Sequence, residues 1–261
     1  RRCVMDNIKQ LLTSSDKGRG RAQGILCYMF RNTLLWANMN YHRWVRATNF
    51  YFDKPHNAKN IDRGNLNKAL SPDDLSWASF KKGMDLLDPY KVTMTITLTW
   101  KSGKTSTYTI VLDQTENEDD IILVALPEGS DDTNLISSIT ERQKNKPKNT
   151  LARLYSEILK SEGVDLTRWQ ALLHDYANNP LNGFTGTKKE TATTISSIQR
   201  QLFEPRLSWN NFRKGLVVLG PIQEDYILTL QWVPEVKCFV DETITHITIR
   251  DPFSTGRNYA K

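Results

Sequence analysis

The spacing of apolar residues changes from a helical to a strand-like period twice along the chain. After Ser76 apolar residues recur at helical spacing, and from Val92 to Trp100 they alternate with polar residues, mostly threonines. A period of about 3.6 indicates an amphipathic helix, and a period of two indicates a half-buried strand. The same change follows Ser208, with alternation from Tyr226 to Trp232. The pattern therefore predicts two segments in which a helix precedes a β-hairpin.

These two segments repeat one another in sequence. Residues 75–100 align without a gap with residues 207–232, a shift of 132, and 11 of the 26 positions are identical. Unrelated sequences of this composition would share about one or two. With a gap, Trp36 also aligns with Trp169. The sequence therefore predicts an internal duplication. Its expected parts are an N-terminal repeat unit at 1–126 with a basic arm at 1–21, a linker at 127–150 and a C-terminal repeat unit at 151–261.

Each repeat unit is expected to begin with helices and to end in the helix and hairpin. Ser76 and Ser208 are suitable N-caps, because a serine hydroxyl accepts from the unpaired N–H groups of the first helical turn. The stretch Lys101–Lys104 is typical of a hairpin turn, and the last strand is expected at about Cys238–Arg250. The other expected helices are at about 22–48, 63–70, 135–141, 151–161, 166–177 and 190–202. This order predicts an α+β fold of two tandem winged-helix-like modules.

Charge changes this picture because it is unevenly distributed. The 261 residues are 39% hydrophobic and 25% charged, with a formal net charge of +6 and no apolar run long enough to span a membrane. Residues 1–50 hold nine basic and two acidic side chains, or +7, so residues 51–261 carry −1. The repeated segments are therefore not basic overall, and nucleic-acid contact is expected from the N-terminal region and a few helix-borne pairs.

Arginine and aromatic residues are interleaved between Tyr28 and Arg46, a combination that suits phosphates and stacked bases. Each capped helix also carries an adjacent basic pair away from its apolar face, where a winged helix contacts a DNA groove. The expected nucleic-acid-binding residues are Arg19, Arg21, Arg31, Arg43, Arg46, Lys68, Lys81, Lys82, Lys101, Lys104, Arg200, Arg213 and Lys214. The alternative interpretation is that the charged side chains form solvated helix faces and that the aromatic residues belong to the core.

Catalytic, metal and cofactor motifs are missing from the sequence. No two of the four histidines have the spacing of helical zinc ligands, and no Gly-x-Ser-x-Gly motif occurs. Gly103-Lys104-Thr105 lacks the preceding glycine of a phosphate-binding loop. We therefore expect no enzymatic activity, no metal and no cofactor. Three cysteines without short spacings favour a reducing, cytoplasmic compartment.

Two functions remain to be compared. The first is a non-enzymatic nucleic-acid-binding protein, for DNA rather than RNA and duplex DNA in particular, such as a replication or regulatory factor of a mobile element. The second is a structural or interaction subunit of a larger assembly, a virion component included, whose strand edges pair with a protein partner or with another copy of the chain. Salt-sensitive binding to an oligonucleotide favours the first function. A stoichiometric complex that resists nuclease and salt favours the second.

Overall fold

The computed structural model describes residues 24–54, 63–71, 75–112, 121–125, 147–179, 188–233 and 239–251. The helices are α2 (Ile25–Trp36), α3 (Tyr41–Asp53), α4 (Arg63–Leu70), α5 (Trp77–Leu86), α7 (Thr150–Ser161), α8 (Leu166–Asn178), α9 (Lys188–Leu202) and α10 (Trp209–Leu219). The strands are β1 (Lys91–Thr99), β2 (Thr105–Leu112), β3 (Ile121–Ala125), β4 (Gln223–Gln231) and β5 (His246–Arg250). This mixture confirms the expected α+β class. The basic arm with Arg19 and Arg21, most of the expected linker and the helix expected near 135–141 lie outside the described residues.

The five strands form a sheet in the order β3-β2-β1-β4-β5, so the two repeated strands, β1 and β4, are neighbours. The Tyr90 N–H donates to the Gln231 carbonyl at 2.9 Å, and the Ile222 N–H donates to the Thr99 carbonyl at 2.8 Å. Adding 132 to Tyr90 and subtracting 132 from Gln231 gives Ile222 and Thr99, so the second bond is the repeat equivalent of the first. The repeated strands therefore pair antiparallel, with equivalent residues at equivalent positions of the pairing. β5 also pairs antiparallel with β4, but it is shorter than expected and begins only at His246.

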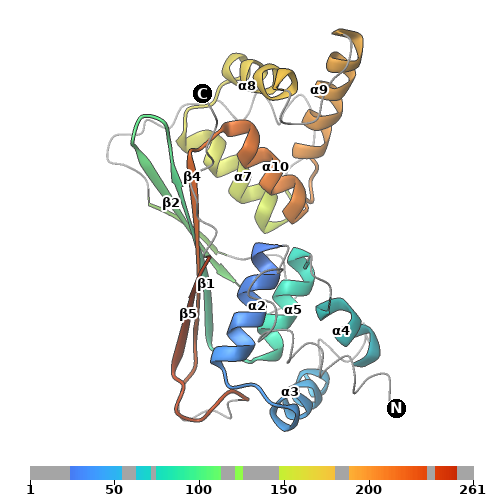
Figure 1. The fold of residues 1–261 in the computed structure, drawn as a ribbon, viewed down its shortest axis with the longest axis vertical. Coiled ribbons are helices and arrows are strands. Elements are labelled where there is room, and N and C mark those ends of the chain that lie inside the picture. Colours follow the sequence, from blue (N-terminus) through green and yellow to red (C-terminus); the bar gives the residue numbers. More distant parts are fainter. Residues whose placement is uncertain are drawn as a thin grey trace. The chain divides into compact units, whose positions relative to one another are not determined.

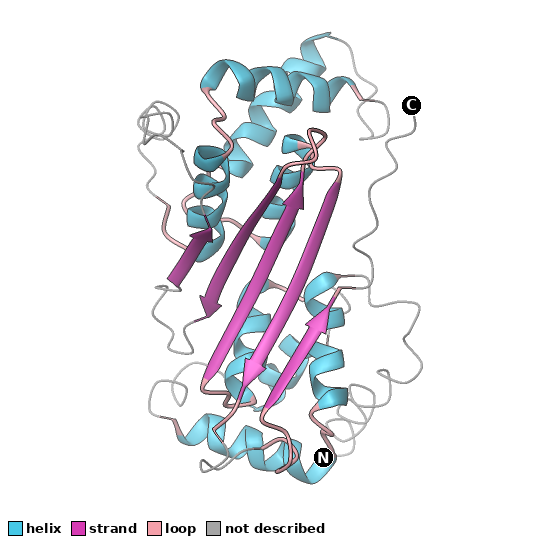
Figure 2. Cartoon of the chain, turned by 90° about the vertical axis from the view of Figure 1, so that its left-hand side faces the viewer, coloured by secondary structure: helices cyan, strands magenta, loops and turns pink. Residues whose placement is uncertain are grey.

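The chain divides into two compact units, here called unit 1 and unit 2. Unit 1 comprises the described residues of 1–96, 109–121 and 225–255, and unit 2 those of 97–108 and 122–224. Unit 1 therefore combines α2–α5 with most of β4 and with β5, whereas unit 2 combines α7–α10 with the turn end of the β1–β2 hairpin (Figure 1). Within each unit the helices lie on one face of the strands (Figure 2), and alternate strand residues are buried.

Both repeated helices begin at the expected serine. The Ser76 hydroxyl oxygen accepts from the Ser79 N–H, and the Ser208 hydroxyl oxygen accepts from the Asn211 N–H. These bonds satisfy N–H groups that the first helical turn leaves without a backbone partner. The predicted N-caps of α5 and α10 are therefore confirmed.

The single helix expected at 22–48 is wrong, because two helices, α2 and α3, meet at a corner. Asn38 has a φ of 49°, a left-handed conformation that ends α2. Asn40 then caps α3, its side chain accepting from the Arg43 N–H. Asparagine adopts the left-handed region more readily than most residues and is a favourable N-cap, so this corner forms without glycine or proline.

The same corner recurs between α7 and α8, at a shift of 125. Gly163 has a φ of 56° just after α7, and Asp165 caps α8. The fourth residue after each cap is a tryptophan, Trp44 or Trp169, and both are fully buried. Trp36, which was expected to match Trp169, is instead 60% exposed at the end of α2. That alignment is wrong, and Trp44 is the counterpart.

Each unit also contains one very close contact between two helices. A methyl group added at Gly83 of α5 would lie 2.6 Å from the ring of Phe30 in α2, and one added at Gly215 of α10 would lie 2.6 Å from the ring of Tyr155 in α7. Glycine therefore lets an aromatic ring of the first helix lie directly on the repeated helix. The equivalent contacts place the aromatic core of each unit at this crossing.

Candidate functional site

In unit 1 the expected binding residues lie on four helices and differ in exposure. Arg43 on α3 donates to the Asn38 carbonyl at 2.7 Å and to the Asp241 carboxylate at 3.2 Å. Arg46, one turn further along α3, is exposed, and so is Lys68 on α4. The half-buried residues are Arg31 on α2 and Lys81 and Lys82 on α5. α3 therefore brings two of the expected residues together, one of them held by an acidic partner.

In unit 2 the basic pair of the repeated helix is held within the fold. Arg213 lies 3.2 Å from the carboxylate of Glu224, whose side chain is 8% exposed. Lys214 donates to the Gln201 side-chain carbonyl at 2.9 Å. A cation that neutralises a buried carboxylate is costly to withdraw, so α10 offers less charge to a ligand than its sequence indicates. The expected residues that remain exposed are Lys101 and Lys104 near the hairpin turn and Arg200 on α9.

An exposed aromatic surface lies at the α2–α3 corner of unit 1. Trp36 is 60% exposed and Tyr41 is 40% exposed, and the Tyr41 ring contacts the His42 ring at a centroid distance of 5.9 Å. Here the α2–α3 corner means Leu35, Trp36, Tyr41, His42 and Arg46. Trp36 and Tyr41 were not among the expected binding residues, because the sequence also allowed them to be core. Alignment of Trp44 with Trp169 in the sequence would have indicated that Trp44, and not Trp36, is the core tryptophan of unit 1.

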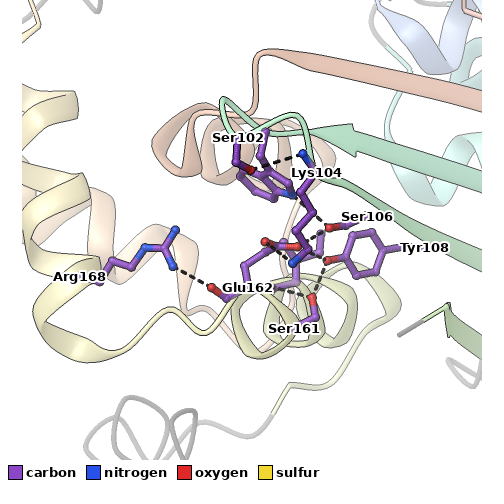
Figure 3. Close-up of polar contacts among 9 residues, drawn as sticks. Ser102, Lys104, Ser106, Tyr108, Ser161, Glu162 and Arg168 are labelled. Carbon is purple, nitrogen blue, oxygen red and sulfur yellow. Dashed lines mark hydrogen bonds and ion pairs between the residues drawn. The ribbon is translucent and has the colours of Figure 1, made fainter. Parts of the chain in front are cut away.

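A second group of polar side chains, here called the polar cluster, lies in unit 2 where the β1–β2 hairpin meets α7 (Figure 3). The Glu162 carboxylate accepts from the Lys104 ammonium at 3.1 Å and from the Ser106 hydroxyl at 2.5 Å. A further hydrogen bond joins the Tyr108 hydroxyl to the Ser161 hydroxyl. The polar cluster consists of Lys104, Ser106, Tyr108, Ser161 and Glu162. It joins residues that are more than fifty positions apart in the chain.

The electrostatics of the polar cluster favour a structural role. Burial raises the pKa of Tyr108 to about 12, with the nearby Glu162 charge adding to the rise and the hydrogen bond from Ser161 opposing it. The phenol is therefore neutral at physiological pH. Glu162 already accepts from three donors, since the Tyr108 hydroxyl also lies 3.4 Å from it. A carboxylate with so many donors holds the hairpin in place.

A cavity of 610 Å³ lies beside the polar cluster, within unit 2. Its walls come from the hairpin turn, α8 and the end of α10. The main lining residues are Trp100, Lys101, Arg168, Leu172, Val217 and Gly220. This volume is in the range of pockets that bind small molecules.

Comparisons with protein-family models, curated proteins and solved structures found no match. Within the described ranges, no three histidine, cysteine, aspartate or glutamate side chains are placed to hold a metal ion. None of the helices in the described part of the chain is long and apolar enough to cross a membrane. Within the described residues, the α2–α3 corner and the cavity of unit 2 are therefore the two candidate binding surfaces.

Proposed function

We propose that the protein is a non-enzymatic nucleic-acid-binding protein and that the α2–α3 corner is its main contact surface. The observation that carries the proposal is the exposure of Trp36 and Tyr41 in the same short segment of the chain as the exposed cation Arg46. Exposed aromatic rings stack on bases, and arginine holds phosphates with a planar, permanently charged group. The corner supplies both kinds of contact within one short segment of the chain.

For duplex DNA we propose a winged-helix-like mode in which α5 enters the groove. A capped helix followed by a hairpin is the arrangement in which such modules place a helix in the major groove and a hairpin against phosphate. α5 carries Lys81 and Lys82, and the preceding helix α4 carries the exposed Lys68. α10 carries the corresponding pair, in which Arg213 lies 3.2 Å from the carboxylate of Glu224 and Lys214 donates to the Gln201 side chain.

The proposal is tested by fluorescence anisotropy with labelled single-stranded and duplex DNA and RNA at low salt. Trp36→Ala is expected to weaken binding roughly 5- to 150-fold, the equivalent of about 1–3 kcal/mol for one stacked base. Tyr90→Ala is the matched control, because Tyr90 is 63% exposed in the same unit but lies outside the corner. Arg46→Gln is expected to reduce the dependence of log K on log salt by about 0.7–0.9, the contribution of one phosphate contact.

Two results would overturn this proposal. One is the absence of binding to every oligonucleotide at low salt, and the other is an equal loss in Trp36→Ala and Tyr90→Ala. The Lys81→Gln/Lys82→Gln double variant separates the two modes. It should weaken duplex binding and leave single-strand binding unchanged if α5 enters a groove.

The same exposed tryptophan favours a second function, that of an interaction subunit. Tryptophan is a frequent anchor at protein interfaces, and Leu35 beside it is 44% exposed. For this function we expect a stoichiometric protein complex that survives nuclease and high salt and is lost in Trp36→Ala. A complex that dissociates on nuclease treatment would instead indicate that the α2–α3 corner binds nucleic acid.

A further inference from the structure

A second corner of unit 1, distinct from the α2–α3 corner, lies where α3 and α5 end and is occupied by charged and aromatic side chains. Lys54 follows α3, and its ammonium lies 2.8 Å from the carboxylates of both Asp85 and Asp88. The same ammonium lies 5.4 Å from the centre of the Phe50 ring. Phe50 in turn packs against Phe239 at a centroid distance of 4.9 Å. These contacts close the corner with side chains of the protein itself.

Trp232 completes this closure in unit 1. Its indole N–H donates to the Leu87 carbonyl at 3.0 Å, and the residue is 4% exposed. Its counterpart in the sequence repeat, Trp100, has a different partner, because its indole N–H donates to the Ser106 hydroxyl at 3.1 Å. The Trp100 side chain therefore lines the cavity of unit 2 instead of bonding to the end of α10.

The corresponding corner of unit 2 is open because its residues are uncharged or small. By the shifts of 125 and 132, the counterparts of Lys54, Asp85 and Asp88 are Asn179, Val217 and Gly220. All three counterparts line the 610 Å³ cavity. The salt-bridged triad of unit 1 is thus replaced by residues that leave space.

The connections that follow Trp100 and Trp232 also differ, and the difference again leaves space in unit 2. The Trp100 N–H donates to the Lys104 carbonyl across residues 101–103, whereas the Trp232 N–H donates to the Thr245 carbonyl across the longer connection 233–244. The longer connection includes Phe239, which packs in unit 1. The short turn in unit 2 brings no such aromatic residue, so the cavity remains beside it.

We propose that this cavity binds a small planar molecule that carries a phosphate, with a nucleoside monophosphate as the representative chemistry. Trp100, Leu172 and Val217 supply an aromatic and apolar wall for a ring. Lys101 and Arg168 are exposed cations among the lining residues, and both suit a phosphate.

The acidic residues that line the cavity do not cancel the positive charge of Lys101 and Arg168. Glu162 is neutralised by Lys104 at 3.1 Å, so Asp175 is the remaining acidic residue against Lys101 and Arg168. The excess of positive charge favours an anionic ligand. The inference stands independently of the α2–α3 corner, which belongs to unit 1.

Isothermal titration calorimetry of the whole chain with AMP, CMP and unphosphorylated adenosine tests the site. Val217→Trp fills the cavity and is expected to abolish AMP binding. Lys101→Gln and Arg168→Gln are each expected to weaken it roughly fivefold or more, since each removes a charged hydrogen-bond donor. Arg43→Gln is the matched control, because Arg43 is the counterpart of Arg168 at the shift of 125 and its guanidinium also donates to a backbone carbonyl, within unit 1. Circular dichroism confirms that each variant is folded.

The proposal is supported if AMP binds more tightly than adenosine and if only the unit 2 variants weaken it. It is overturned if no nucleotide binds, if Val217→Trp binds AMP as wild type does, or if Arg43→Gln loses as much affinity as Arg168→Gln. A 5′-phosphorylated oligonucleotide that displaces AMP identifies a strand end as the source of the phosphate and ring. An oligonucleotide that leaves AMP bound identifies a free nucleotide.

Discussion

Replacing Lys54 by methionine is expected to destabilise unit 1 by about 3 kcal/mol. The Lys54 ammonium lies 2.8 Å from the Asp85 and Asp88 carboxylates, and the Asp85 side chain is 8% exposed. Methionine preserves much of the apolar stem and removes the cation from a buried carboxylate. Breaking a buried ion pair from one side costs roughly 3–5 kcal/mol. The 16% exposure of the Lys54 side chain places the expected loss at the lower end of this range.

The second repeat supplies a matched rescue for this change. Lys54→Asn combined with Asp85→Val installs in unit 1 the two residues, Asn179 and Val217, that stand at the equivalent positions of unit 2. The double variant removes the buried carboxylate together with its cation, so at least half of the stability lost in Lys54→Met should return. With the single variants Lys54→Asn and Asp85→Val completing the cycle, a large non-additive coupling between the two positions is the signature of the ion pair.

Urea denaturation followed by circular dichroism measures these differences, first at neutral pH and then in alkaline buffer. Burial lowers the pKa of Lys54, but the hydrogen bonds and charges of Asp85 and Asp88 outweigh it and raise the pKa above the usual 10.5. A folded-state pKa that is raised contributes stability that is complete below pH 10.5 and is lost as the pH rises through the folded-state value. The gap between wild type and Lys54→Met should therefore narrow at high pH. A loss below about 1 kcal/mol, or a double variant less stable than Lys54→Met, would refute the reasoning.

Three other changes have expected outcomes. Gly215→Ala should lower the melting temperature, because the new methyl group lies 2.6 Å from the Tyr155 ring and overpacking costs about 1–3 kcal/mol; a higher melting temperature, as the helix propensity of alanine alone implies, would contradict this contact. Glu162→Gln should cost about 1 kcal/mol in urea denaturation by weakening the charged hydrogen bonds of the polar cluster, whereas Glu157→Gln on the same helix should have little effect. In ultraviolet titration, the difference between wild type and Tyr108→Phe should show a phenol ionising near pH 12. Because the pKa of Tyr108 is raised in the folded state, the free energy of unfolding should fall between pH 10 and 12. A transition near pH 10 would contradict this prediction by showing an unburied phenol.

Local residue types were enough to predict several elements of the fold. A serine before an apolar helical segment marks an N-cap wherever the helix lies, so α5 and α10 could be placed from Ser76 and Ser208 alone. Strict alternation requires that one face of a strand is buried, and it predicted β1 and β4. Such signals depend on neighbours within a few positions, and tertiary contacts did not override them.

The residues between α2 and α3 do not by themselves predict that the helix is interrupted there. Asn38 is one of several asparagines in the segment, and nothing marks it as the residue with positive φ. The informative residue is Gly163, at the same position of the other corner. This relation was hidden because the connection from α3 to α5 is seven residues shorter than the connection from α8 to α10, so the repeat shift changes from 125 to 132. An ungapped comparison covers only the second part.

The distribution of exposed charge also depends on contacts that the sequence does not indicate. Arg43 finds its acidic partner 198 positions away at Asp241, and Lys104 finds Glu162 58 positions away. No spacing rule connects such residues, because the fold alone brings them together. The sequence could therefore nominate cations for binding, while the structure decides which of them, such as Arg46 and Lys101, remain exposed.

The way the two units share strands has a consequence for synthesis of the chain. Unit 1 needs residues 225–255, which the ribosome adds long after α2–α5 have left it, whereas the described part of unit 2 is finished at residue 224. Domains generally fold during synthesis once all their parts are available. The helices that emerge first must therefore wait for β4 and β5, with the surfaces that Trp232 and Phe239 later cover still exposed. Among the described residues, the unit that is begun first is therefore the one completed last.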